Sequence, residues 1–183
     1  MRREEERLTL KDGRSCVLRT IREEDAAELL NAMRQTARET PFLARTESDW
    51  EAQTVEAMTR RLRGEIDSDS ILTLVAEVDG QIVGRGMIGF MTGAKTRHRA
   101  TVGIGLFKSC WGQGIGTAMM EALLDEARKH GCVQQVELGV IEGNSRARAL
   151  YEKLGFRLTG IQPGAFRQED GSLVDEYMMM RKL

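Results

Sequence analysis

The sequence of 183 residues is 41% hydrophobic and 30% charged, with a formal net charge of −1 at pH 7. This length suits one domain with a sizeable core, and the balance of residue types is that of an ordinary globular protein. The near-neutral charge argues against a nucleic-acid-binding or membrane-surface protein, and no apolar run approaches the roughly 20 residues that span a bilayer. The charged N-terminus lacks a secretory signal pattern, so we expect a cytoplasmic protein.

The cysteines are few and scattered, and none belongs to a CxxC pair or a cysteine–histidine cluster. An odd number at wide spacing does not support a disulfide framework, and without clustered ligands a zinc site is not supported either. We therefore expect reduced thiols and no bound metal. The three residues are Cys16, Cys110 and Cys132.

The chain is predicted to open with a hairpin and a helix. Extended runs at residues 8–10 and 15–19 flank the turn signal KDG at residues 11–13. Acidic residues at 23–25 favour a helix start, and the following apolar residues have helical spacing until the break at Pro41.

A second helix is predicted beyond Pro41. Ser48 and Glu51 have the spacing of a capping box, and the apolar residues behind them repeat at helical intervals until Gly64. We expect the helix to begin at the box and to end at that glycine.

Three strands are then predicted before the next helix. Residues 71–78 and 81–91 are strand-like and flank an Asp-Gly pair, which is a strong hairpin signal. Residues 92–99 are polar and predict a loop, and residues 101–107 predict a third strand.

The C-terminal part alternates between helix and strand. Helices are predicted over residues 115–131 and 145–154, with a strand at 135–141 between them and strands at 156–166 and 173–181 behind them. Helices interspersed among antiparallel hairpins predict an α/β fold with a mixed sheet.

The segment that carries chemistry is WGQGIGT, residues 111–117, between a predicted strand and a predicted amphipathic helix. A helix start leaves backbone N–H groups without partners, and glycines let the backbone approach a ligand closely. The combination predicts a cradle for a pyrophosphate. The competing interpretation is a tight turn that binds nothing.

The ligand of this turn is a separate question. A nucleoside triphosphate loop needs a lysine after the last glycine, and Thr117 stands there instead. A dinucleotide fingerprint reads G-x-G-x-x-G, whereas this turn reads G-x-G-x-G, although Glu137 lies where a ribose-binding acid would be expected. A nucleotide-binding oxidoreductase is thus a weaker alternative.

Two motifs resemble those of the GCN5-related N-acetyltransferase (GNAT) family. Gly114-Ile115-Gly116 matches the glycine half of its acetyl-CoA motif, Q/R-x-x-G-x-G/A, with Trp111 at the position that usually holds Gln or Arg. Residues 144–156, NSRARALYEKLGF, resemble the second family segment almost residue for residue. Trp111 removes one side-chain donor, which leaves pyrophosphate binding to the backbone amides.

The resemblance implies one acetyltransferase domain over residues 1–183, with an acetyl-CoA-binding core at about 100–158. The family fold is a mixed, mostly antiparallel sheet flanked by helices, whose two central strands splay at a bulge; Gly103 and Gly105 suit that place. The residues implied to bind acetyl-CoA are Ile104, Gly105, Leu106, Trp111, Gly112, Gln113, Gly114, Ile115, Gly116, Thr117, Asn144, Arg146, Ala147 and Tyr151.

The resemblance also implies a general acid and raises a difficulty about the base. Tyr151 matches the family tyrosine that protonates the departing CoA sulfur; without the family it would be an ordinary tyrosine at the rim of the core. Many members carry a glutamate where this chain has Thr101, which is no base at neutral pH. We expect Glu137 as the replacement, with other candidates at Glu39, Asp175 and Glu176.

The function implied is direct transfer of acetyl from acetyl-CoA to a primary amine within a ternary complex. The acceptor is a small molecule, an amino acid or a protein N-terminus, and no nucleic acid, membrane or metal takes part. Dimers are common in the family, so we also consider a homodimer. The alternative is a CoA-binding sensor or interaction module that keeps the fold without turnover, motivated by the missing glutamate.

Overall fold

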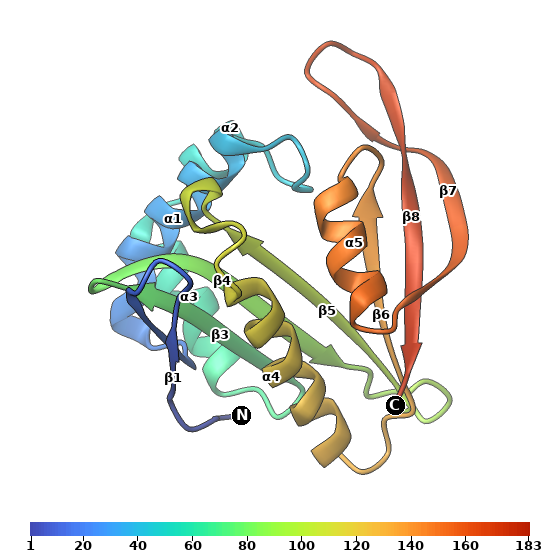
Figure 1. Ribbon diagram of the computed structural model, residues 1–183, viewed down its shortest axis with the longest axis horizontal. Coiled ribbons are helices and arrows are strands. Elements are labelled where there is room, and N and C mark those ends of the chain that lie inside the picture. Colours follow the sequence, from blue (N-terminus) through green and yellow to red (C-terminus); the bar gives the residue numbers. More distant parts are fainter.

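Eight strands form one sheet in the order β1-β2-β3-β4-β5-β6-β8-β7 in the computed structural model, which describes residues 1–183 (Figure 1). All neighbouring strands are antiparallel except β5 and β6, which run parallel. The strands are β1 (Glu6–Thr9), β2 (Ser15–Thr20), β3 (Ile71–Val78), β4 (Gln81–Phe90), β5 (Arg99–Leu106), β6 (Gln135–Ile141), β7 (Arg157–Arg167) and β8 (Leu173–Lys182).

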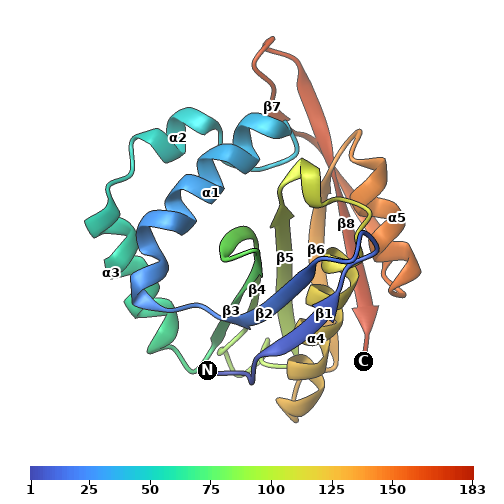
Figure 2. The same ribbon diagram turned by 60° about the vertical axis from the view of Figure 1, so that its left-hand side comes forward.

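Helices cover both faces of the sheet (Figure 2). On one face lie α1 (Ala26–Glu39), α2 (Glu47–Glu51) and α3 (Val55–Ile66); on the other lie α4 (Ile115–Lys129) and α5 (Ser145–Lys153). Strand β3 is buried along almost its whole length because it lies between the two layers. None of the helices has the length and apolar character needed to cross a lipid bilayer.

The predicted hairpins are present, but the second predicted helix is wrong in detail. It is two helices, because Thr54 begins α3 with its own side-chain cap. The capping box of α2 is formed by Thr46 and Asp49: the Asp49 carboxylate accepts from Thr46 N at 2.8 Å. Ser48 lies inside this helix, and α3 continues past Gly64 to Ile66, because a single glycine weakens a packed helix without ending it.

The expected splay of the two central strands is confirmed. Strands β5 and β6 are paired only from Arg99–Thr101 to Gln135–Glu137 and then diverge. The expected bulge at Gly103 and Gly105 is wrong, since β4 pairs with β5 in regular register as far as Leu106. The opening therefore comes from the divergence of two parallel strands.

Charged groups beneath the helices are matched with opposite charges. Arg19 binds the Asp25 carboxylate through two hydrogen bonds of 2.7 and 2.9 Å and also binds Glu77 at 3.0 Å. On the inner side of α3, the Arg85 guanidinium binds both oxygens of Glu65 at 2.9 Å. Such pairing is what makes a buried charge tolerable.

Candidate active site

A cavity of about 690 Å³ opens where β5 and β6 diverge. The glycine turn, the start of α4, one side of α5 and the segment after α1 complete its wall. It brings together all but two of the residues that the sequence predicts to bind the cofactor. These are Ile104, Gly105, Leu106, Trp111, Gly112, Gly114, Gly116, Thr117, Asn144, Arg146, Ala147 and Tyr151.

The glycine turn has the conformation that a phosphate cradle needs. Gly112 and Gly114 have φ angles of 78° and 97°, which side chains rarely adopt, and a Cβ at either position would meet only open space. Gly114 is the N-cap of α4, so the unpaired N–H groups and the positive end of the helix face the cavity. A pyrophosphate therefore fits here without a side-chain donor.

The single hydrogen-bond donor of the Trp111 side chain is used within the protein. The indole Nε1 donates to the Leu106 carbonyl at 3.0 Å, which ties the glycine turn to the end of β5. The Arg146 guanidinium lies 5.1 Å from the centre of the indole ring, within the range of a cation–π contact. Trp111 thus connects the two motifs and orients Arg146 at the cavity wall.

Two predicted ligands do not reach the cavity. Ile115 is the first residue of α4, and its side chain is fully buried in the core. Gln113 points the other way, and its Oε1 accepts a hydrogen bond from the backbone N of Asp12 at 3.2 Å. This bond holds the turn between β1 and β2, and that turn brings Lys11 to the cavity. Nothing in the sequence pattern indicated Lys11.

Tyr151 reaches the cavity from α5. Asn144 begins the helix, because its Oδ1 accepts from Ala147 N at 3.2 Å, and Tyr151 then packs against Phe156 with ring centres 6.0 Å apart. The tyrosine is 5% exposed, and burial raises its pKa to about 12. The phenol is therefore protonated at neutral pH and can donate a proton or a hydrogen bond.

The residue expected as the base, Glu137, is engaged elsewhere. Arg99 donates to both of its oxygens at 2.6 Å, and Gln135 donates to one of them at 2.7 Å. The hydrogen bonds from Arg99 lower the pKa of Glu137, which makes it a weaker proton acceptor. Glu137 is also absent from the cavity wall.

Of the four carboxylates considered as bases, Glu176 alone lines the cavity. Glu39 accepts from the Lys108 backbone N at 2.5 Å, and Asp175 accepts from Gly164 N at 2.9 Å, so both are structural. Glu176 forms no hydrogen bond or ion pair with protein groups. It lies across Gly139, where a Cβ would be 1.8 Å from its Oε1. Glycine at position 139 therefore makes the room that Glu176 occupies.

A smaller cavity of about 360 Å³ adjoins the first on the side of the β7–β8 tip. Five residues line both cavities, so the two spaces are continuous: Thr40, Leu43, Ala44, Ile141 and Phe166. The other residues that line the smaller cavity come from the end of α1 to the start of α2 and from the β7–β8 tip.

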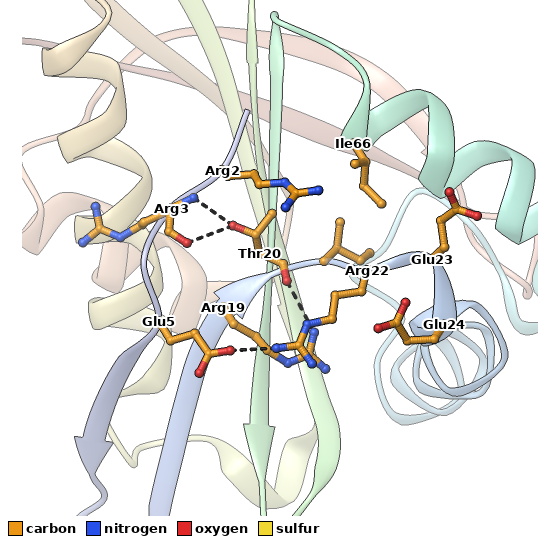
Figure 3. A pocket seen from close by; sticks show the side chains of 10 residues that line it. Arg2, Arg3, Glu5, Arg19, Thr20, Arg22, Glu23, Glu24 and Ile66 are labelled. Atoms are coloured by element: carbon orange, nitrogen blue, oxygen red, sulfur yellow. Dashed lines mark hydrogen bonds and ion pairs between the residues drawn. The ribbon is translucent and has the colours of Figure 1, made fainter.

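Another hollow, of about 610 Å³, lies along the N-terminal segment, far from both motifs in the sequence (Figure 3). It is highly charged, but much of that charge is already paired. Arg22 donates to Glu5 at 2.7 Å, and Arg19 points inward to Asp25. Of the charged residues that line this hollow, only Arg2 and Glu24 form no side-chain hydrogen bond or ion pair.

A family model described as the acetyltransferase (GNAT) family matches residues 26–156. The chain belongs to the GNAT family. The L-amino acid N-acetyltransferase AaaT of Escherichia coli is 30% identical over 115 residues, which are 63% of this chain and 70% of that protein. A GNAT acetyltransferase from Streptococcus pneumoniae superposes with a TM-score of 0.85 at 29% identity, covering 92% of this chain and 99% of its own.

Another similar protein was solved with a form of CoA bound. RimJ of Mycobacterium smegmatis, solved in complex with CoA-disulfide, has a TM-score of 0.78 at 26% identity and covers 97% of this chain and 86% of its own. As a GNAT member, the chain is an N-acetyltransferase that uses acetyl-CoA. The mixed, mostly antiparallel α/β fold expected from the resemblance is confirmed, and the dinucleotide interpretation of the glycine turn gives way to acetyl-CoA.

Proposed function

We propose that the chain acetylates an α-amine, carried by a free amino acid or by a protein N-terminus. The names of two relatives support this acceptor chemistry: the L-amino acid N-acetyltransferase AaaT, and the [ribosomal protein bS18]-alanine N-acetyltransferase of Escherichia coli, which is 42% identical over 59 residues. The observation that carries the proposal is one cavity that holds an unpaired carboxylate, Glu176, and a buried phenol, Tyr151.

The cavity wall assigns a binding role to each part. The backbone amides of the glycine turn and the start of α4 would hold the pyrophosphate. The backbone of residues 102–106, which has no strand partner on its β6 side, would pair with the pantetheine arm. A backbone N–H from residues 104–106 would donate to the acetyl carbonyl.

Acetyl-CoA supplies the acetyl group: a C–N bond forms to the acceptor amine as the C–S bond breaks, and CoA leaves as its thiol. Glu176 takes the proton that the ammonium form of the acceptor must lose. Tyr151 provides a proton to the departing sulfur, and its raised pKa of about 12 keeps that proton available at neutral pH. The second proton that the nitrogen loses as the amide forms restores the Tyr151 hydroxyl. Binding acetyl-CoA and the acceptor amine in one cavity adds to the rate enhancement through proximity.

Cellular location and assembly also belong to this proposal. The three cysteines are free, which suits a reducing compartment such as the cytoplasm. A homodimer is the assembly we propose to test by light scattering.

The deciding experiment is an amine screen with acetyl-CoA, read as the release of free thiol. The panel contains free amino acids, short peptides with the same first residues, and amine drugs. Turnover with free amino acids alone or with peptides alone separates the two sources of the α-amine. Tight acetyl-CoA binding without thiol release for any amine would instead favour a CoA-binding sensor or interaction module.

Glu176→Gln tests the base, with Glu137→Gln as the matched control on the neighbouring strand. We expect Glu176→Gln to lower kcat by about 10- to 100-fold near pH 7 without changing the Kd for acetyl-CoA. The defect should shrink as the pH rises and the free amine form becomes abundant. Glu137→Gln should keep wild-type kcat; the reverse pattern would return the base to Glu137.

A further inference from the structure

The turn between β1 and β2 is a rigid structure. Leu10 N donates to the Arg14 carbonyl at 2.8 Å, and Gly13 N donates to the Leu10 carbonyl at 3.0 Å. The Asp12 carboxylate accepts from the Arg14 backbone at 3.1 Å and from its guanidinium at 2.8 and 3.0 Å. Leu10 is buried in the core, so the start of the turn is anchored there.

This turn lies against the glycine turn, about a hundred residues away in the sequence (Figure 2). The contact is the hydrogen bond from Asp12 N to Gln113 Oε1 at 3.2 Å. Its result is that Lys11, next to Asp12, joins Trp111 and Gly112 in the cavity wall. Gln113 therefore positions a residue of the N-terminal hairpin at the phosphate end of the cavity.

Lys11 is free to bind an anion. It forms no ion pair, although Asp12 is its neighbour, because the Asp12 carboxylate is taken up by Arg14. The glycine turn offers only backbone donors, since Trp111 gives its N–H to Leu106. A cation beside this turn would add a charged donor to the backbone amides that face a pyrophosphate.

We propose that the Lys11 ammonium binds the pyrophosphate of acetyl-CoA and replaces the side-chain donor that Trp111 does not provide. Gln113 is the positioning residue that holds the Lys11 turn in place. The inference rests on the proposed binding of acetyl-CoA in this cavity. A lysine suits the role because it acts as a mobile point charge on a long stem and needs no fixed geometry.

The test compares Lys11→Met with Lys95→Met, a control at an exposed lysine in the β4–β5 loop, outside the cavity wall. Binding is measured by calorimetry with acetyl-CoA, with acetyl-dephospho-CoA, which lacks the 3′-phosphate, and with S-acetylpantetheine, which lacks every phosphate. We expect Lys11→Met to raise the Kd of the first two by the same factor, about 3- to 10-fold for one partly exposed charge contact. S-acetylpantetheine should have the same Kd for wild type and for Lys11→Met. Lys95→Met should have the wild-type Kd for all three ligands.

The role of Gln113 is tested by coupling. Gln113→Leu should raise the Kd for acetyl-CoA, and the double variant with Lys11→Met should bind no worse than Lys11→Met alone. Additive losses would overturn the positioning role.

Three outcomes would overturn the Lys11 proposal. One is an unchanged Kd for acetyl-CoA in Lys11→Met, and another is a loss that disappears with acetyl-dephospho-CoA, because the contact would then be to the 3′-phosphate. The third is wild-type protein that does not bind acetyl-CoA, which would overturn the proposed function as well. The first two leave that function intact, so the failures are distinguishable.

Discussion

Charged side chains are paired in the layer beneath α3 but unpaired in the wall of the cavity between β5 and β6. Under α3, Arg85 and Glu65 are paired with each other, and Glu65 also accepts from Thr73 at 2.7 Å. In the cavity wall, no charged residue has an ion pair or a side-chain hydrogen bond to the protein. These residues are Lys11, Glu121, Arg146, Lys153 and Glu176.

The difference separates charges that are paired within the fold from charges that are free at the cavity wall. A buried charge without a partner costs several kcal/mol, so the packed layer pairs its charges with each other, although the Nε atom of Arg85 has no hydrogen-bond partner. The free cations and the two free carboxylates of the cavity wall cost less because the cavity is open to water. We therefore expect changes in the packed layer to alter stability and changes in the cavity wall to alter binding or turnover.

The largest expected effect is on the packed layer. Arg85→Met leaves Glu65 without its main buried partner, and we expect a loss of about 3 kcal/mol in the free energy of unfolding. Urea denaturation measures it, and kcat per folded molecule should stay close to wild type. A double variant that also carries Glu65→Gln should recover part of the loss. Wild-type stability in Arg85→Met would show that this ion pair does not stabilise the fold.

At the cavity, Tyr151→Phe removes a proton donor and little packing. We expect kcat to fall by about 100-fold, with the Kd for acetyl-CoA within about twofold of wild type. Since burial raises the pKa of Tyr151 to about 12, the wild-type phenol keeps its proton throughout an ordinary pH profile. Steady-state kinetics from pH 6 to 10 should therefore show no alkaline loss due to this group, and an equal kcat in the variant would exclude it as the acid.

Gly139→Ala sharpens the assignment of Glu176. The added Cβ would lie 1.8 Å from Glu176 Oε1, so the Glu176 carboxylate must move away from position 139. We expect a fall in kcat of about tenfold from the misplaced base, with little change in the melting temperature. Gly160→Ala on β7 is the matched control, because a Cβ there meets open space. A wild-type kcat in Gly139→Ala would show that the position of Glu176 does not matter.

The smallest effect is expected at the ion pair that joins β5 to β6. The hydrogen bonds from Arg99 lower the pKa of Glu137 below its ordinary value of 4.5. This stabilisation is present above that value and is lost as the pH falls through the lowered pKa. Glu137→Gln should thus melt slightly below wild type at pH 7, and the difference should vanish in acid. A difference that persists in acid would point to packing instead of charge.

Much of the fold could be predicted because its signals are local. The Asp-Gly pair at residues 79–80 marks the β3–β4 hairpin, and Asn144 and Gly155 bound α5. The predicted boundaries of α2 and α3 are wrong because Thr46, Ser48 and Thr54 can all cap a helix, and the structure uses Thr46 and Thr54. The splay was expected from the family resemblance, but its cause, the divergence of β6 from β5, depends on long-range pairing.

The glycine turn and the α5 segment could be predicted without the structure, because strand, turn and helix cap are built from consecutive residues. The sequence therefore led to acetyl-CoA and to Tyr151. The four candidate carboxylates differ only in the tertiary structure: β8 lies between β6 and β7, which places Glu176 over Gly139 in the cavity wall, while Glu137 is hydrogen-bonded to Arg99. Lys11 is also a tertiary result, since a hydrogen bond between turns a hundred residues apart leaves no pattern in the sequence.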